Sequence, residues 1–258
     1  MDFTFTTMAT PGVEISKIIE EGINYGFSGI DFRVVTPRGG EIDVNISDDA
    51  IEEIKNLMGD KIYISSLFCY NKTIHAGEEE MIESVIKHME LAERLSVKNI
   101  RIFPGKAENN EVLDKICYVL NKVFEKCDKK VNVLLQNHLN NGITSVQALY
   151  IKRKVSDNRY GFIFSPDEAV KGGEDYMNTL EDICKITRQV FIADLDNDMK
   201  YTLIGKGKIN FKCILTKMIE YGYTGLVTLK WEKCWCDYLP SYKEGFSSFL
   251  KLKEFLEK

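Results

Sequence analysis

The feature that most constrains this chain is a regular alternation of two kinds of segment. Short apolar runs rich in β-branched and aromatic residues alternate with amphipathic segments from one end to the other. Such alternation is typical of successive strand–helix units that build a parallel sheet. The run 131–135 is almost continuously apolar, as a strand covered on both faces should be. Strands are expected at 3–7, 29–35, 61–67, 99–103, 131–136, 161–165, 190–194 and 226–231.

The segments between these strands carry apolar residues at helical spacing. One helix is expected to begin after Asn210, which is placed as an N-cap, and to end at Gly222. Its apolar face consists of Phe211, Ile214, Leu215, Met218 and Ile219. The same spacing recurs over 82–92 and in the last helix, which begins at about Tyr242. No segment rich in Pro, Gly or Ser divides the chain, so residues 1–258 are expected to form a single domain.

About eight strands and eight helices in 258 residues match the size of a (β/α)8 TIM barrel. A doubly wound open sheet is the alternative. One internal repeat favours the barrel, because residues 25–30 (YGFSGI) recur as residues 221–226 (YGYTGL). In each copy a helix is expected to end at the first glycine, and a strand to begin just after the second. Equivalent units near both termini are expected where the first and last members of a ring are neighbours.

Composition and charge narrow the function classes. The net charge is −5 and the lysines are spread along the chain, which argues against a nucleic-acid-binding face. No apolar run approaches the roughly 18 residues that a membrane span needs. No basic region precedes an apolar stretch at the N-terminus, so we expect a soluble cytoplasmic protein without a membrane partner. Seven cysteines without regular spacing fit reduced, mostly buried thiols.

Candidate functional residues lie where the strands end, because barrel enzymes place their sites at the C-terminal ends of the strands. We predict Glu232 and His138 as catalytic residues, and a mouth on which Arg33, Gln136, His138, Ser165, Asp194 and Glu232 converge. The predicted substrate-binding residues are Arg33, Arg101, Gln136, Lys230 and Trp231. Trp231 could either stack against a sugar or pack within the barrel. This charge-mixed rim suits a small polyhydroxylated or anionic ligand. The phosphate-loop, dinucleotide and serine-hydrolase motifs are absent.

Four stretches in order along the chain resemble one family. They are 25–33 (YGFSGIDFR), 99–105 (NIRIFPG), 203–211 (LIGKGKINF) and 221–233, which ends in KWEK. Together they resemble the xylose-isomerase-like TIM barrels, in particular the sugar phosphate isomerases and epimerases. The resemblance covers nearly the whole chain. It implies a (β/α)8 barrel and proton transfer on a sugar or sugar phosphate.

The resemblance also implies a divalent metal, Mn, Zn or Mg, held by four side chains at strand ends. At the matching positions this chain has Gln136, Ser165, Ala193 and Glu232, so three of the four ligands are altered. Asp167, Glu168, Asp194 and Asp196 lie nearby and could substitute only by moving in. We therefore expect no tightly bound metal at this position and assign no cofactor.

Two functions remain open from the sequence. The first is a sugar or sugar-phosphate isomerase or epimerase, with Glu232 as general base and His138 orienting a substrate oxygen. The second is a barrel that binds a carbohydrate or related small ligand without metal and without turnover. An endonuclease acting on abasic DNA would need a metal cluster rich in histidine, which three histidines and an acidic chain do not support. The partner in either case is a small molecule, and the oligomeric state stays open.

Overall fold

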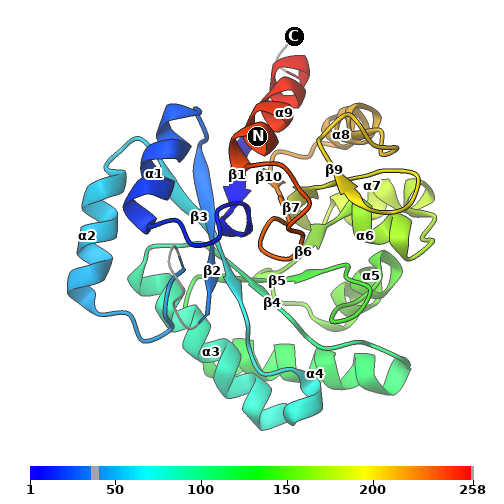
Figure 1. Cartoon of the computed structure of the whole chain (residues 1–258). Helices are drawn as coiled ribbons and strands as arrows, with labels where there is room; N and C mark the ends of the chain where they lie inside the picture. Colours follow the sequence, from blue (N-terminus) through cyan, green and yellow to red (C-terminus); the bar gives the residue numbers. More distant parts are fainter. Residues whose placement is uncertain (36–40, 257–258) are drawn as a thin grey trace.

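The computed structural model describes residues 1–35 and 41–256, and within these ranges eight parallel strands close into a barrel (Figure 1). Their order around the barrel is β1-β10-β7-β6-β5-β4-β3-β2. The strands are β1 (Asp2–Thr6), β2 (Gly29–Val34), β3 (Tyr63–Cys69), β4 (Asn99–Ile102), β5 (Asn132–Gln136), β6 (Tyr160–Phe164), β7 (Thr187–Ile192) and β10 (Leu226–Leu229). Because β1 pairs with both β2 and β10, the sheet has no edge, and the open-sheet alternative is excluded. The predicted (β/α)8 barrel is confirmed.

Helices surround the barrel in Figure 1, and four of them begin at a side-chain cap. Ser47, Asn109, Thr144 and Asn210 each accept a hydrogen bond from a backbone amide of the first helical turn, so the predicted Asn210 cap is confirmed. The helices are α1 (Ile15–Asn24), α2 (Asp48–Met58), α3 (Glu78–Arg94), α4 (Asn110–Lys126), α5 (Ser145–Lys154), α6 (Pro166–Lys171), α7 (Leu180–Cys184), α8 (Phe211–Glu220) and α9 (Tyr242–Leu256). Short 3-10 turns lie at Thr7–Ala9, Ile74–Ala76 and Tyr176–Asn178.

The repeated segment serves the same purpose in both copies. Gly26 and Gly222 follow α1 and α8 with φ of +74° and +84°, a conformation that glycine adopts without strain. Strands β2 and β10 begin three and four residues later, at Gly29 and Leu226. These two strands flank β1 in the barrel, so the repeat marks equivalent units of the ring.

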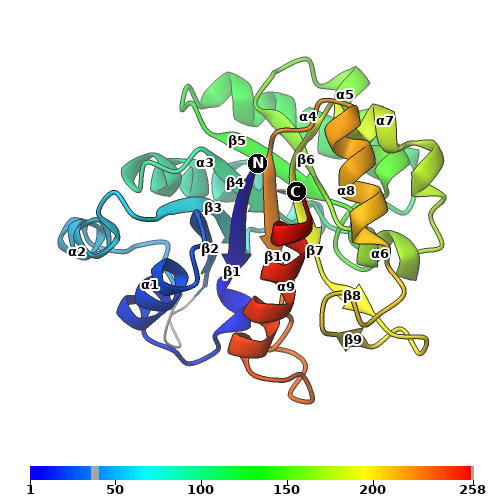
Figure 2. The ribbon, with the colours of Figure 1, turned by 90° about the horizontal axis from the view of Figure 1, so that it is seen from above.

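Two details of the chain after β6 differ from the sequence prediction. Strand β7 begins at Thr187, three residues earlier than expected, because Gln189 faces the barrel interior and breaks the apolar run. A small antiparallel hairpin, β8 (Asp194–Leu195) with β9 (Tyr201–Thr202), follows β7 and was not predicted. Figure 2 shows this hairpin on the side to which the arrows of β1 and β10 point.

The barrel interior is layered along the strands. Near the N-terminal ends the side chains are polar: Thr4 and Thr228 share a 2.7 Å hydrogen bond, and Gln189 donates to Thr228 and to Asp31. The next layer is apolar and consists of Met8, Phe68, Leu134, Ile163 and Phe191. This layer separates the polar interior from the mouth. In the described part of the chain, no helix combines the length and apolar character that crossing a membrane requires.

Candidate active site

A cavity of about 430 Å³ opens at the C-terminal ends of the strands. Five of the seven predicted site residues line it, namely Arg101, Gln136, His138, Lys230 and Glu232. They come from β4, from the end of β5 and the loop after it, and from the segment after β10. Their side chains meet because parallel strands of a barrel all end at the same rim.

The centre of the site is an ammonium group among carboxylates. The Nζ atom of Lys230 lies 2.7 Å from Asp167 Oδ2, 3.5 Å from Glu168 Oε1 and 3.4 Å from Glu232 Oε1. The Lys230 side chain is only 3% exposed and that of Asp167 is fully buried. Asp167 and Glu168 belong to the first turn of α6, directly after β6. We name Lys230, Asp167, Glu168 and Glu232 the charge cluster.

The charge cluster holds more carboxylates than its one lysine can balance, and this imbalance falls on Glu232. Burial and repulsion from Asp167 and Glu168 outweigh the attraction of Lys230 and raise the pKa of Glu232. Burial opposes the charge on Lys230, but the surrounding carboxylates raise its pKa well above the ordinary value. Burial also opposes the charge on Glu168, yet the Lys230 ammonium and the Leu139 amide lower its pKa. Glu232 is therefore the carboxyl group of the charge cluster whose environment most favours holding a proton.

His138 is a neutral hydrogen-bond donor in this setting. Burial lowers the pKa of its imidazole to about 4, although Glu168 pulls in the opposite direction. Its Nδ1 atom accepts from the backbone amides of Asn140 and Asn141, both at 3.3 Å, so the proton of the neutral ring is assigned to Nε2. The ring meets Phe103 edge-on at 5.8 Å. The imidazole can therefore donate one hydrogen bond, and it does not act as a cation at neutral pH.

Arg101 and Gln136 line the cavity with hydrogen-bond donors. Arg101 Nη2 donates to Gln136 Oε1 at 2.6 Å, and its guanidinium lies between the rings of Phe68 and Phe103, at 3.8 and 3.5 Å. Burial lowers the pKa of Arg101 to about 10, so it stays charged at neutral pH. Its Nε and Nη1 atoms and Gln136 Nε2 find no partner among the described residues. Buried donors of this kind favour an oxygen-rich ligand.

Arg33 lies outside this cavity, contrary to the prediction of a single mouth. It forms an ion pair with Glu41 and lines a neighbouring cavity of about 940 Å³. Its guanidinium lies 5.3 Å from the Tyr70 ring and 5.4 Å from the Trp235 ring. Tyr70 and Trp235 line both cavities and form the wall between them.

Trp231 is a packing residue, and the sugar-stacking alternative is wrong for it. The side chain is 1% exposed, and its Nε1 donates to the Pro240 carbonyl. The ring lies against Gly245 of α9, where an added methyl group would come within 3.0 Å of it. Trp235, which is 64% exposed and lines the cavity, is the tryptophan that the mouth presents.

Ser165 and Asp194 also have structural partners in place of the expected convergence on the mouth. Ser165 Oγ donates to Asp167 Oδ1 at 2.6 Å, which orients that carboxylate. The Asp194 carboxylate accepts from the backbone amides of the loop 203–209 and its own neighbour, and does not line the cavity. Its donors are Leu195, Gly205, Gly207 and Ile209, at 2.9 to 3.2 Å.

Sequence reasoning noticed Asp167 and Glu168 only as neighbours of Ser165, and it missed Tyr201. The Tyr201 hydroxyl donates to Asp167 Oδ2 at 3.2 Å, and its ring lies 3.7 Å from the Lys171 ammonium. Tyr201 belongs to β9, so the unpredicted hairpin supplies one side of the site. The Pro-Asp-Glu sequence after β6 was the available signal for the two carboxylates.

The donor set does not fit the metal that the resemblance implies. The oxygen of Gln136 is already bonded to Arg101, the Ser165 hydroxyl donates to Asp167, and Ala193 has no donor atom. Glu232 faces the Lys230 ammonium. Within residues 1–35 and 41–256, no group of three or more His, Cys, Asp or Glu side chains is arranged to hold a metal ion.

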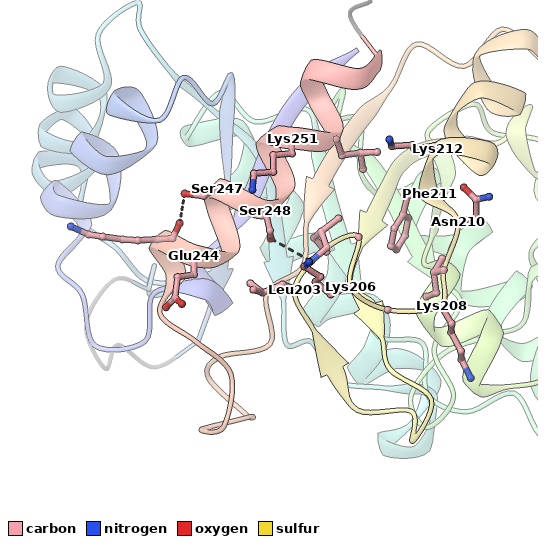
Figure 3. A pocket seen from close by; sticks show the side chains of 16 residues that line it. Leu203, Lys206, Lys208, Asn210, Phe211, Lys212, Glu244, Ser247, Ser248 and Lys251 are labelled. Atoms are coloured by element: carbon pink, nitrogen blue, oxygen red, sulfur yellow. Dashed lines mark hydrogen bonds between the residues drawn. The ribbon is translucent and has the colours of Figure 1, made fainter.

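A further cavity, of about 840 Å³, lies on the outer face between α8, α9 and the loop 203–209 (Figure 3). Lysines surround it: Lys206, Lys208, Lys212, Lys243 and Lys251. The amides of Gly205 and Gly207 in this loop are bonded to Asp194 and cannot bind a phosphate there. None of the predicted site residues lines this cavity.

Comparisons with known proteins agree with this architecture. Residues 19–252 match the family described as the xylose isomerase-like TIM barrel. The IOLI protein, solved with a bound zinc atom, is 17% identical with a TM-score of 0.78 over 98% of this chain and 96% of its own. A probable 3-DHS dehydratase from Bacillus anthracis is 14% identical with a TM-score of 0.78, over 97% and 99%. D-psicose 3-epimerase from Clostridium cellulolyticum H10, solved with D-tagatose, is 11% identical with a TM-score of 0.79, over 98% and 99%. No curated protein matches the sequence.

Proposed function

Because the chain belongs to the xylose isomerase-like TIM barrel family, we propose that it is an isomerase or epimerase of a small sugar or sugar phosphate, acting at the mouth cavity. Structures with the same fold include D-psicose 3-epimerase solved with D-tagatose and 3-keto-D-glucoside 4-epimerase from E. coli. Their names support a sugar as the substrate class. The residues of this chain support proton transfer as the reaction type.

The observation that carries the proposal is the Glu232 carboxylate, with its raised pKa, beside a cavity lined with hydrogen-bond donors. Glu232 takes a proton from the carbon next to the substrate carbonyl, and the electron pair of that C–H bond forms an enediolate. Arg101 and the Nε2–H of His138 donate to the substrate oxygens as negative charge develops on them. Glu232 then returns the proton to the adjacent carbon, while the proton of the neighbouring hydroxyl passes to the former carbonyl oxygen, and the product is the isomer. Return to the opposite face of the same carbon, after the enediolate has turned, gives the epimer. Neither route needs an external oxidant or reductant.

Isotope exchange tests this proposal directly. Ketoses, aldoses and their phosphates are incubated with the protein in D2O, and deuterium at the carbon next to the carbonyl is measured by NMR. We expect exchange with at least one of these sugars. Glu232→Gln should slow exchange by about 100-fold or more, the usual value of a positioned base. Glu111→Gln, an exposed carboxylate on α4, is the matched control and should leave the rate unchanged.

The pH profile gives a second readout for the same residue. Glu232 acts as a base only while it is deprotonated. Because its pKa is raised, the exchange rate should begin to drop at a higher pH, as the solution is acidified, than it would with an ordinary glutamate as base. Full exchange in the Glu232→Gln variant would contradict the assignment.

The second candidate, a binding protein, is favoured by the close contact of Glu232 with Lys230. Sugar binding by calorimetry without any exchange would establish that candidate instead.

A further inference from the structure

We infer that the Lys230 ammonium is a resident cation of the mouth: it occupies the charge cluster in place of a divalent metal and makes the site metal-independent. This goes beyond the assignment of Lys230 as a substrate contact. The placement of the ammonium is independent of any activity. The role that it would have in the reaction rests on the proposed function.

One ammonium group, that of Lys230, lies within 3.5 Å of three carboxylates. Lys230 has the same strand parity as Thr228, whose hydroxyl lies inside the barrel, so its side chain also points inward, toward the cavity that it lines. Its three N–H groups face carboxylates from two separate parts of the chain, Asp167 and Glu168 in α6 and Glu232 after β10. An ammonium has three donors and no acceptor, which suits this arrangement.

Two of the three carboxylates, Asp167 and Glu168, are held in place by contacts besides the one with Lys230. Asp167 accepts from Ser165 Oγ and from Tyr201 Oη, and Glu168 accepts from the Leu139 amide. The cluster is therefore oriented by the ends of β5 and β6 and by the β8–β9 hairpin. Such outer contacts are the usual support of a fixed ionic site.

A divalent ion cannot join this cluster while Lys230 stays. Metal–oxygen distances of about 2.0–2.6 Å would bring the ion against the ammonium, because both would contact the same oxygens. The repulsion between the two cations is strong in a buried site. The neutral side chains nearby cannot offset it, since the Gln136 oxygen is bonded to Arg101.

The role of Lys230 is electrostatic and not nucleophilic. Its contacts with three carboxylates keep the amine protonated, and a protonated amine cannot attack a carbonyl carbon to form a Schiff base. If the proposed isomerase reaction takes place, the ammonium stabilises negative charge on the substrate oxygens, together with Arg101. It supplies one positive charge at a fixed place in the cavity.

Metal titration of the intact protein tests the inference without a substrate. Protein treated with a chelator is titrated with Mn2+ and Zn2+ by calorimetry, and bound metal is measured by mass spectrometry. The wild type should bind neither ion stoichiometrically. In Lys230→Ala the carboxylates of Asp167, Glu168 and Glu232 should move in around an ion. This variant should gain one Mn2+ site that binds at least 100-fold more tightly than any site in the wild type. The control is Lys171→Ala, which removes another lysine that lines the cavity and should gain no site.

The outcomes separate clearly. One equivalent of metal in the wild type would overturn the inference, as would a folded Lys230→Ala that binds no more metal than the wild type. If Lys230→Ala folds only when Mn2+ is present, that rescue supports the inference. If it does not fold at all, the wild-type titration decides alone. Absence of isotope exchange with every sugar would reject the proposed function and leave the metal result standing.

Discussion

At the residue scale, Asp31 is a buried carboxyl group with few hydrogen-bond donors around it. It lies in the polar layer of the barrel, where Oδ2 accepts from Gln189 and Oδ1 has no partner among the described residues. Burial, only partly opposed by Gln189 and Arg101, raises its pKa from 3.8 to about 7. Between these two values the folded protein holds a proton that the unfolded chain has released. The contribution of Asp31 to stability therefore falls as the pH rises through this window.

Asp31→Asn should remove this pH dependence. The variant keeps a neutral group of the same shape, so its melting temperature relative to the wild type should be higher at pH 8 than at pH 5. The effect is limited to about 1.4 kcal/mol per pH unit, and each kcal/mol corresponds to about 2–4 °C for a protein of this size. Thermal melts at both pH values measure it. Asp49→Asn, an exposed position on α2, should show no such difference. An equal shift at both pH values would contradict the prediction.

The site residues illustrate what alternation along a strand can and cannot predict. Lys230 and Glu232 line the mouth cavity and Trp231 between them points toward α9, so the two-residue alternation of β10 continues past its end at Leu229. The packing role of Trp231 was therefore predictable. The position of Arg33 was not, because its ion pair with Glu41, a residue in a loop, draws it into the neighbouring cavity. An ion pair between a strand residue and a loop residue leaves no periodic pattern in the sequence.

At the scale of elements, the loop 203–209 is held in large part by one carboxylate. Asp194 accepts backbone amides at three positions of this loop, in addition to its own neighbour. The loop passes so close to Asp194 that a methyl group on Gly207 would lie 2.3 Å from Asp194 Oδ1. Glycine is thus required at this point because the loop passes so close to the segment that contains Asp194.

Asp194→Asn should release this loop. The amide side chain loses the charge and turns an N–H group toward backbone donors, so the free energy of unfolding should fall by about 2 kcal/mol. Chemical denaturation measures the loss, and hydrogen exchange should become faster in 203–209. Asp196→Asn is the matched control, because among the described residues its carboxylate accepts from the amides of Asp198 and Lys200 alone, at the exposed tip of the hairpin. Equal losses in the two variants would show that the loop does not depend on Asp194.

The long strands and helices could be predicted from the sequence because their burial leaves a periodic pattern, as in β5 and α8. The hairpin of β8 and β9 could not, since each strand has only two residues. Periodicity needs a longer segment than this to be recognised. Tyr201 was missed for the same reason, although its hydroxyl bonds to the charge cluster.

At the scale of the whole molecule, the ring closes where the two ends of the chain meet. Strand β1 pairs with β10, and α9 covers this junction in Figure 2. Phe246 of α9 is fully buried against Phe5 and Phe27, with ring centroids 4.6 and 4.8 Å apart. These contacts join the first and last units of the barrel, so the closure has a high sequence separation.

Phe246→Ala should destabilise the entire barrel. Truncation of a buried phenylalanine costs about 3–5 kcal/mol, through lost burial and the cavity that remains. Urea unfolding gives the measurement. Phe255→Ala on the same helix removes a ring that is 43% exposed, so it should cost less than about 1 kcal/mol. If the two losses were similar, the aromatic contacts at the junction would not be what closes the ring.

Lys230 has a consequence for how such a barrel depends on its surroundings. A bound ion must be obtained from the available pool, and tighter-binding transition metals can displace the correct one. Lys230 is part of the polypeptide, so every chain contains it. It cannot be lost when metal ions are scarce, and another ion cannot replace it. The same lysine limits the chemistry, because a single positive charge polarises a carbonyl less than a divalent ion does. A protein built in this way gives up some reactivity and keeps its function wherever metals are scarce or contested.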